Sequence, residues 1–330
     1  MRPTTIWCNL RLDGPARAQL EAGTAGHALV WAAAPGANNP SGTPDPVLAR
    51  QPVEVVFGQP EASQCAELLA QTDRALRWVH LSSAGYTPFD NDRLRSALRA
   101  ASVPLTTSSG VFAEPCAQHA LALMLAAGRR LPAAVLNQHQ QRGWPKSDLR
   151  WSSVLLRRQK VLLVGYGAIA RRLVELLRPF DIEVNAVRRS PRGDELVPTH
   201  AIDDLPALLA QADHVLDLLP GNGETSRFFD AARFRACKPG ALFYNLGRGT
   251  TVDQDALIAA LTSGPLAAAY LDVTDPEPLP PSHPLWTTAN CFITPHTAGG
   301  HRDENDRLVE HFLANLPRHL AGEPLLDRVI

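Results

Sequence analysis

Three polar side chains that could carry acid–base chemistry each follow an apolar, strand-like stretch in the second half of the chain. Arg248 follows ALFYNLG, Glu277 follows AAAYLDVTDP and His296 follows CFITP. Because open α/β sheets bind ligands outside the carboxyl ends of their strands, we expect these three side chains to share one site. Each also has a simpler structural explanation, as a surface cation, a turn residue before a proline and a partly buried histidine.

The combination suits the reduction of a carbonyl group by hydride. The carbonyl oxygen must gain a proton as it becomes an alcohol, and a histidine can deliver that proton near neutral pH. A carboxylate beside the histidine favours the imidazolium and fixes its orientation. An arginine can bind a substrate carboxylate and polarise the carbonyl. The set therefore predicts His296 as the proton donor, Glu277 as its partner and Arg248 as the substrate ligand.

A glycine pattern indicates that the hydride donor is a dinucleotide. The segment KVLLVGYGAIARRL places Gly165, Gly167 and Ala170 in a GxGxxA pattern between an apolar strand and a helix. The first glycine permits a tight turn, the second lets the backbone approach a pyrophosphate, and the third position needs a small residue for helix–strand packing. The start of the helix, at Ala168 and Ile169, then offers its N–H groups to the phosphates. A purely structural glycine turn is the alternative.

The segment VNAVRRSPRG places Arg188 and Arg189 at the end of the next strand, where dinucleotide-binding sheets often carry an acid that binds the ribose. Arg188 follows Gly165 at about the expected spacing of that acid, roughly 20 residues. An acid would repel a 2′-phosphate, whereas two arginines and Ser190 can bind one. The sequence therefore predicts NADP as the preferred cofactor. NAD is the alternative if both arginines simply face solvent.

The chain around these residues alternates strand-like and helix-like runs. In the first hundred residues the strand-like runs are 4–10, 27–33, 53–58 and 77–83, and the helix-like runs are 62–71 and 90–101. An apolar helical run at 114–131 and a Trp-containing loop at 142–154 follow, and the alternation restarts at Lys160. The Pro- and Gly-rich segment 36–52 is expected to be an exposed loop. This pattern predicts an α/β protein with two parallel-sheet units.

Composition argues against several classes of protein. A net charge of −1 supplies no field that would recruit nucleic acid or an anionic membrane. The five cysteines show neither a CxxC pair nor metal-ligand spacing, so we expect free thiols and no metal site. The N-terminus lacks the apolar core of a signal peptide, and no apolar run approaches the roughly 20 residues of a membrane span. We expect a cytoplasmic protein with no nucleic-acid or membrane partner.

Several longer motifs resemble the D-isomer-specific 2-hydroxyacid dehydrogenase family. FYNLGRGTTVDQDALIAAL, LDVTDPEPLPPSHPLW and ITPHTAGG occur in that order after GYGAIA, and LLPGNGETSRFF belongs to the same pattern. The resemblance covers essentially the whole chain. It implies an NAD(P)-dependent enzyme that interconverts a 2-oxoacid and a D-2-hydroxyacid, similar to glyoxylate/hydroxypyruvate reductases. It also implies a homodimer.

The resemblance assigns roles to individual residues. In that family the Arg of the NxxRG segment binds substrate, and the Glu of the EPLP segment pairs with the catalytic His; these are Arg248, Glu277 and His296 here. A Gly-containing loop holds the substrate carboxylate on backbone N–H groups, and SSAGYTPFD resembles it, which nominates Gly85 and Tyr86. The dinucleotide-binding residues that the glycine pattern and the resemblance nominate together are Gly165, Gly167, Ala168, Ile169, Arg188, Arg189, Ser190, Pro220, Leu246, Gly247, Arg248, Asp272, His296, Ala298 and Gly299.

The family fold also implies two Rossmann-like or flavodoxin-like parallel-sheet domains with an active-site cleft between them, and it implies how the chain is divided. We expect a discontinuous substrate-binding domain, 1–108 plus 300–330, whose last helix returns to the N-terminal part. A dinucleotide-binding Rossmann domain spans 109–299. The sequence departs from the common family pattern at three positions. Tyr86 replaces a small aliphatic residue, Ala170 replaces the third glycine, and Gln118 lies where an acid is frequent.

Two other functions stay open. A non-catalytic, corepressor-like or redox-sensing protein of the same fold would bind the dinucleotide without turnover, although it needs no proton chemistry from Arg248, Glu277 and His296. A relative that uses another hydride donor, such as formate or phosphite, is the second. The His–Glu pair argues against formate, whose oxidation releases no alcohol proton.

Overall fold

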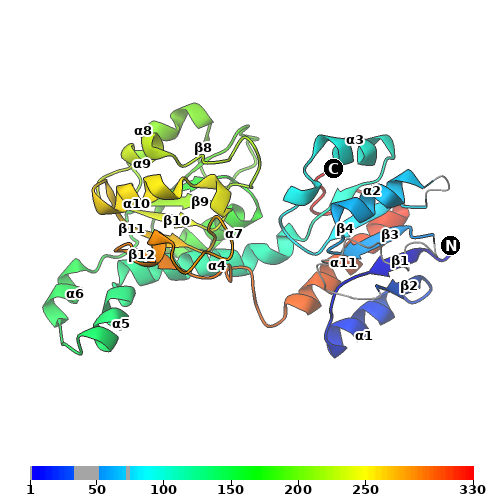
Figure 1. The fold of residues 1–330 in the computed structure, drawn as a ribbon, viewed down its shortest axis with the longest axis horizontal. Coiled ribbons are helices and arrows are strands. Elements are labelled where there is room, and N and C mark those ends of the chain that lie inside the picture. The colour runs from blue at the N-terminus through cyan, green and yellow to red at the C-terminus, as the bar shows by residue number, and fades with distance from the viewer. Residues whose placement is uncertain (1, 33–51, 72–74) are drawn as a thin grey trace. The chain divides into compact units, whose positions relative to one another are not determined.

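The computed structural model describes residues 2–32, 52–71 and 75–330, which form two compact units (Figure 1). Unit 1 comprises Met1–Phe112 and His301–Ile330, and unit 2 comprises Ala113–Gly300. Each unit is built on one sheet whose strands pair in parallel, so the predicted α/β fold of two parallel sheets is confirmed. The loop expected at 36–52 lies, except for its last residue, outside the described residues.

Unit 1 contains a five-stranded sheet in the order β2-β1-β3-β4-β5. Its strands are β1 (Thr5–Cys8), β2 (Ala28–Trp31), β3 (Val55–Gly58), β4 (Trp78–Leu81) and β5 (Leu105–Thr106). Helices α1 (Gly14–Gly23) and α11 (Glu304–Ala321) share a core on one face of the sheet, and α2 (Ala62–Ala70) and α3 (Asp92–Ala100) share a core on the other. Phe312 joins α11 to the sheet by stacking on Phe57 and Trp78, with ring centroids 4.2 and 5.2 Å apart.

Unit 2 contains a seven-stranded sheet in the order β12-β11-β10-β9-β6-β7-β8. Its strands are β6 (Lys160–Val164), β7 (Glu183–Val187), β8 (Thr199–His200), β9 (His214–Asp217), β10 (Ala241–Asn245), β11 (Leu266–Leu271) and β12 (Cys291–Ile293). The chain runs outward from β6 to β8 and then continues on the other side of β6 with β9. Open α/β sheets bind ligands at such a reversal of strand order, beyond the carboxyl ends of the strands. The topology therefore places the expected site beyond β6 and β9.

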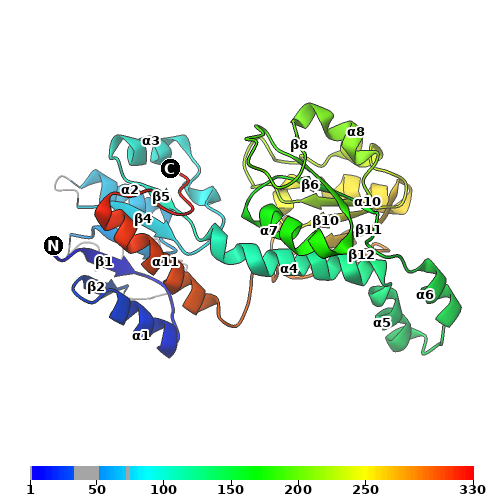
Figure 2. The same ribbon diagram turned by 180° about the vertical axis from the view of Figure 1, so that it is seen from behind.

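Helices cover both faces of this second sheet, which explains why its strands are apolar runs rather than alternating ones. The helices α8 (Leu205–Leu209), α9 (Ala231–Arg235) and α10 (Gln254–Thr262) bury their apolar side chains in the core on one face. The helices α4 (Ser109–Gly128) and α7 (Ala168–Leu177) lie along the other face (Figure 2). Short 3₁₀ turns are η1 (Thr87–Phe89), η2 (Arg178–Phe180), η3 (Ile202–Asp204), η4 (Gly249–Thr251) and η5 (Pro284–Trp286).

The part of the sequence between β5 and β6 differs from the sequence prediction in two ways. Helix α4 begins at Ser109, not near Glu114, and carries Pro115 inside it. The predicted loop at 142–154 is wrong, because it contains α6 (Lys146–Ser152), which follows α5 (Leu131–Gln140). A proline directly before a helix is compatible with its first turn, so Pro145 does not prevent α6. Among the described helices, no single one is long and apolar enough to cross a membrane. The pair α4 and α5, bent by 66°, meets the criterion for a broken span by length and composition only.

Candidate active site

The predicted phosphate loop connects β6 to α7 at the carboxyl end of the central strand. Gly165 has a φ of +98°, and a Cβ atom there would lie 2.9 Å from the carbonyl oxygen of Leu218, so the position requires glycine. Gly167 caps α7, and open space beyond its Cα leaves room for a ligand to approach the backbone. Ala170 is fully buried where α7 packs on the sheet. The loop has the geometric features that a pyrophosphate site requires.

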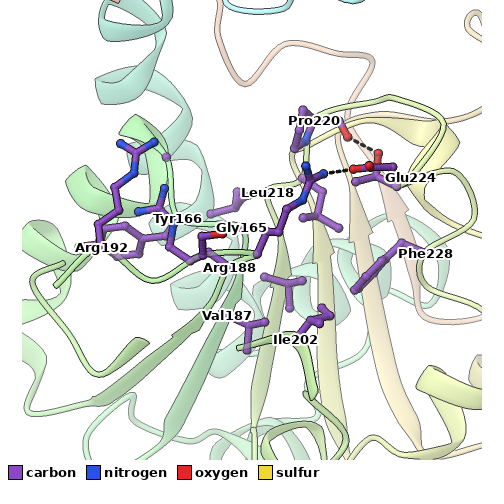
Figure 3. A pocket seen from close by; sticks show the side chains of 16 residues that line it. Gly165, Tyr166, Val187, Arg188, Arg192, Ile202, Leu218, Pro220, Glu224 and Phe228 are labelled. Carbon is purple, nitrogen blue, oxygen red and sulfur yellow. Dashed lines mark hydrogen bonds and ion pairs between the residues drawn. The ribbon is translucent and has the colours of Figure 1, made fainter. Parts of the chain in front are cut away.

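A cavity of about 570 Å³ lies beside this loop (Figure 3). It is lined by Val164, Gly165, Tyr166, Gly167, Val187, Arg188, Arg189, Ser190, Arg192, Ile202, Leu218, Leu219, Pro220, Glu224, Thr225 and Phe228. Val187 and Ile202 offer an apolar surface that suits the flat face of a purine ring. Three arginines bring positive charge to the same wall. The lining therefore suits the adenosine half of a dinucleotide, at the place where the sheet topology predicts the site.

Arg188 is held by a carboxylate that belongs to its own loop. Its Nη1 donates to Glu195 at 2.8 Å, and the backbone N–H groups of Arg192 and Gly193 donate to the same carboxylate at 2.9 and 2.7 Å. The side chain of Glu195 is only 4% exposed. The hydrogen bonds, first that from Arg192 and then that from Arg188, lower the pKa of Glu195 to about 2. Glu195 therefore stays ionised and closes the loop 188–195 around itself.

Arg189 pairs with Glu224, a contact drawn as the dashed line between a guanidinium and Glu224 in Figure 3. Both side chains are largely exposed, at 72% and 71%. Because water competes with an exposed ion pair, such a pair contributes about 0–1 kcal/mol. Arg189 can therefore exchange Glu224 for another anion at little cost. Ser190, which follows it, is exposed and lines the same cavity.

Arg248 lies in the loop 246–251 directly after β10, and that loop is tightly constrained. A Cβ atom at Gly247 would lie 2.6 Å from the carbonyl oxygen of Leu219, so the loop packs backbone to backbone on the turn after β9. Nδ2 of Asn245 donates to the carbonyl oxygen of Arg248 at 3.0 Å. Nη1 of Arg248 donates to the carbonyl oxygen of Gly247 at 2.7 Å. The guanidinium keeps its other N–H groups available for a ligand.

His296 and Glu277 form the pair that the sequence predicts. Nδ1 of His296 lies 2.8 Å from Oε2 of Glu277, and both side chains are open to solvent. The other oxygen of Glu277 accepts a hydrogen bond from the backbone N–H of Thr274 at 3.0 Å. His296 has a left-handed φ of +51°. Because Nδ1 faces the carboxylate, Nε2 is the ring nitrogen left to exchange a proton with a substrate.

Asp272 anchors the turn that carries His296. Its buried carboxylate accepts hydrogen bonds from the hydroxyl of Thr294 at 2.6 Å and from the backbone N–H groups of Thr297 and Ala298 at 2.9 and 3.0 Å. Nε2 of His119, on α4, lies 3.2 Å from the same Thr294 hydroxyl. Asp272 therefore fixes the backbone on both sides of His296.

The remaining predicted residues occupy three places. Gly85 and Tyr86 lie in unit 1 between β4 and η1, where the hydroxyl of Ser83 donates to the carbonyl of Gly85 at 2.7 Å and the ring of Tyr86 packs against the core. Gln118 on α4 donates to Glu114, which pairs with Arg172 on α7. In unit 2, Ala168 and Ile169 begin α7, Pro220 lines the cavity, Leu246 and Gly247 belong to the Arg248 loop, and Gly299 follows Ala298.

Comparison with known proteins gives this arrangement a family. The model of the D-isomer specific 2-hydroxyacid dehydrogenase, NAD binding domain, matches residues 121–298. The chain belongs to the D-isomer specific 2-hydroxyacid dehydrogenases. It is 36% identical over 221 residues to the glyoxylate reductase/hydroxypyruvate reductase of Homo sapiens, a match that covers 65% of this chain and 66% of the human protein.

Two further relatives span more of the dehydrogenase chain. The glyoxylate/hydroxypyruvate reductase B of Citrobacter koseri is 34% identical over 252 residues, or 75% of this chain and 76% of that protein. A D-isomer specific 2-hydroxyacid dehydrogenase of Xanthobacter autotrophicus Py2, solved in complex with NADPH and MES, superposes with a TM-score of 0.80 at 27% identity. That likeness covers 100% of this chain and 98% of the other. The predicted family and an NAD(P)-dependent oxidoreductase activity are confirmed.

Sequence reasoning missed the residues that hold this dehydrogenase's predicted site residues in place. Glu195 and Glu224 hold Arg188 and Arg189. Glu195 lies in no recognisable motif, and the motif LLPGNGETSRFF, which contains Glu224, does not reveal that ion pair. His119 on α4 contacts Thr294 in the His296 turn, although the two residues are 175 positions apart in the sequence. One signal was available for Glu195, because an acid seven residues after an arginine at a strand end can fold back on it.

Proposed function

We propose that this D-2-hydroxyacid dehydrogenase is an NADPH-preferring 2-oxoacid reductase of the glyoxylate/hydroxypyruvate type. The observation that carries the proposal is the His296–Glu277 pair, placed in the same unit as a cavity lined by a glycine phosphate loop and arginines. The pair offers a proton of the kind that carbonyl reduction needs. In this proposal unit 2 is the dinucleotide-binding domain and unit 1 is the substrate-binding domain.

The residues beside the cavity fit a dinucleotide. A side chain at Gly165 would meet the backbone of Leu218, and the open Cα of Gly167 leaves the start of α7 accessible to phosphate oxygens. Arg188 and Arg189 would hold a 2′-phosphate, with Ser190 as a neutral donor. When bound, the nicotinamide supplies the hydride.

The chain's own residues do the rest of the reaction. Nε2 of His296 donates the proton that the substrate oxygen gains, because Nδ1 faces Glu277. Glu277, itself held by the N–H of Thr274, keeps the imidazole ring oriented. The guanidinium of Arg248 binds the carboxylate of the 2-oxoacid and polarises its carbonyl. In unit 1, the backbone N–H groups of Gly85 and Tyr86 are the candidates that the family resemblance nominates for binding a substrate carboxylate.

A substrate screen tests the proposal. Glyoxylate, hydroxypyruvate, pyruvate and bulkier 2-oxoacids are each assayed with NADPH and with NADH by the loss of the reduced-nicotinamide absorbance. We expect the highest kcat/KM for glyoxylate or hydroxypyruvate with NADPH. Binding of NADPH without turnover of any 2-oxoacid would favour a non-catalytic regulatory protein instead.

The substitution Arg248→Lys tests how the substrate is bound. Lysine keeps the positive charge but loses the planar fork that donates two parallel hydrogen bonds to a carboxylate. We expect the KM for the preferred 2-oxoacid to rise by about tenfold, and kcat/KM to fall at least as much, from the loss of one charge-assisted hydrogen bond. The Kd for NADPH, measured by fluorescence, should rise much less than the KM for the 2-oxoacid, because lysine keeps the positive charge. Kinetics equal to those of the wild type would mean that Arg248 acts only as a general cation.

We further propose that the enzyme is a homodimer formed through the segment 129–155, which contains α5 and α6 and projects from unit 2 in both views (Figures 1 and 2). Its exposed apolar side chains are Leu131, Val135, Leu136, Trp144, Trp151, Val154 and Leu155. Trp144 and Trp151 are 90% and 80% exposed. Monomers rarely expose so many large apolar groups in one segment. Sedimentation equilibrium should give a dimer for the wild type and a monomer for the double variant W151S/L155S.

We also propose a cytoplasmic location for the enzyme. All five cysteines, Cys8, Cys65, Cys116, Cys237 and Cys291, are free thiols, and all but Cys291 are buried. Unpaired cysteines are usual in proteins of reducing compartments. Fractionation of the producing cell should place the enzyme with the cytosolic proteins. Recovery outside the cytosol would contradict the proposed location.

A further inference from the structure

A buried carboxyl group lies beneath the loop that carries Arg248. Asp217 ends β9 and is 0% exposed. One oxygen, Oδ1, accepts a hydrogen bond from the backbone N–H of Leu219 at 3.0 Å. The other, Oδ2, lies 2.5 Å from the hydroxyl of Thr251, which is also fully buried. The same hydroxyl lies 2.5 Å from the carbonyl oxygen of Arg248.

The number of protons at these three oxygens decides how they are arranged. Thr251 has one hydroxyl proton, but its oxygen lies 2.5 Å from two other oxygens, and each contact of that length needs a proton between the two atoms. A carbonyl oxygen supplies none. If Asp217 were ionised, one of the two contacts would join two acceptors and would be repulsive. If Asp217 is protonated, it donates to Thr251, and Thr251 donates to the carbonyl of Arg248.

We propose that Asp217 is a positioning residue that works in its protonated form, as the first donor in a chain of hydrogen bonds through Thr251 to the carbonyl of Arg248. These hydrogen bonds hold the loop 246–251 in the conformation that presents the Arg248 guanidinium. This inference rests on the proposed function only for the role of Arg248. The protonated carboxyl and its partners are a property of the fold itself.

The surroundings of Asp217 favour the neutral acid. Its partners in strand register are Val164 on β6 and Asn245 on β10, neither of which is titratable. The only charged side chain of the loop it faces is Arg248, and that guanidinium donates to Gly247. Burial is the main cause that raises the pKa of Asp217 to about 7, against smaller opposite effects of its contacts with Thr251 and with the backbone N–H of Leu219. A neutral acid needs no counter-charge in such a place.

The raised pKa gives the stability of the protein a predictable dependence on pH. Between the ordinary carboxyl value of 3.8 and about 7, the folded state holds a proton on Asp217 that the unfolded state has released. Stability therefore falls as pH rises through this window, because the folded state binds more protons there. Above about 7 the contribution is lost. Asp217→Asn is always neutral, can accept from Leu219 and donate to Thr251, and should not show this part of the slope.

The first test compares wild type and D217N without any assay of activity. The thermal midpoint of each is measured from pH 5 to pH 9, and the infrared band of a protonated carboxyl group is recorded at pH 6. We expect the wild type to lose more stability than D217N across the range. We also expect a carboxyl band in the wild type that is absent from D217N. Parallel stability curves, or no such band, would overturn the proposal.

If D217N does not fold, variants of Thr251 test the proposal through the pH dependence of stability. Thr251→Val removes the hydroxyl that accepts the proton of the neutral carboxyl group, so the protonated form loses its partner and the midpoint of the pH-dependent part of the stability curve should move to lower pH. Thr251→Ser keeps the hydroxyl and should leave the midpoint in place. Thr24→Val is the matched control, because Thr24 is a buried threonine of unit 1 whose hydroxyl donates only to the backbone of its own helix. An unmoved midpoint in T251V would contradict the proposed chain of hydrogen bonds.

Steady-state kinetics then tests the link to Arg248. T251V should raise the KM for the 2-oxoacid by about tenfold, the effect of one lost buried hydrogen bond, and T251S and T24V should change it little. The ratio of the wild-type KM to that of D217N should rise from pH 6 to pH 9, since the ionisation of His296 is common to both proteins. A wild type that reduces no 2-oxoacid, but shows the expected band and stability slope, would refute the proposed function and leave the protonated Asp217 intact.

Discussion

His296→Ala is expected to lower kcat for 2-oxoacid reduction by about 10²–10⁴-fold, which corresponds to roughly 3–5 kcal/mol of barrier. The physical reason is that the substrate oxygen must then take its proton from water rather than from Nε2 of a fixed imidazole. The Kd for NADPH should change much less, because the phosphate loop and the arginines of the cavity follow β6 and β7, whereas His296 follows β12. Both quantities can be measured on the same preparation, by stopped-flow reduction and by fluorescence titration.

His139→Ala is the matched control for this prediction. His139 is an exposed histidine in the last turn of α5, in the same unit, and lines no part of the cavity. H139A should have the kcat of the wild type. Retention of most of kcat in H296A would exclude His296 as the proton donor.

Glu277→Gln shows whether the pair acts as a unit. Glutamine keeps the shape and can still accept from the N–H of Thr274, but it removes the negative charge 2.8 Å from Nδ1 of His296. Loss of that charge disfavours the imidazolium, so the alkaline limb of the reductive pH profile should move to lower pH. An unmoved limb would mean that Glu277 orients the ring without affecting its protonation.

The order of elements and the main site residues follow from local patterns, and so they were predictable from sequence. The GxGxxA turn requires a strand before it and a helix after it, and the structure places β6 and α7 there. Arg248, Glu277 and His296 follow β10, β11 and β12 of one parallel sheet, and the carboxyl ends of parallel strands lie at one edge. Their positions after these strands, together with their chemistry, therefore predict one shared site.

The partners of these residues were not predictable, because they depend on tertiary contacts. The carboxylate of Asp272, a residue that the family resemblance nominates for the cofactor site, accepts hydrogen bonds from the turn 294–298. Seeing this requires the pairing of β11 with β12, which brings two segments more than 20 residues apart side by side. The predicted start of helix α4 was wrong for a local reason. Pro115 is typical of a first turn, so the predicted start of α4 came five residues too late.

The second large effect is expected in the choice of cofactor. Wild-type enzyme should prefer NADPH over NADH in kcat/KM by at least about tenfold, or about 1.4 kcal/mol. The double variant R188A/R189A should lose that preference and keep its selectivity among 2-oxoacids. Initial rates with each cofactor at a fixed concentration of the preferred 2-oxoacid measure both. The charge-reversal variant R235D, at an exposed arginine of α9 outside the cavity, should keep the preference.

The structure explains why alanine is a better replacement for Arg188 than aspartate. It also explains why the preference for NADPH should hold although both arginines already pair with glutamates. An aspartate at position 188 would face the ionised Glu195, so R188D would add a repulsion that has no bearing on the cofactor. Arg188 uses one N–H on Glu195 and keeps the others for a phosphate. Arg189 must leave Glu224, but that exposed pair costs only about 0–1 kcal/mol to open, less than a charge-assisted hydrogen bond of roughly 1.5–3 kcal/mol to a phosphate dianion. Equal kcat/KM for NADPH and NADH in the wild type would show that both arginines serve only Glu195 and Glu224.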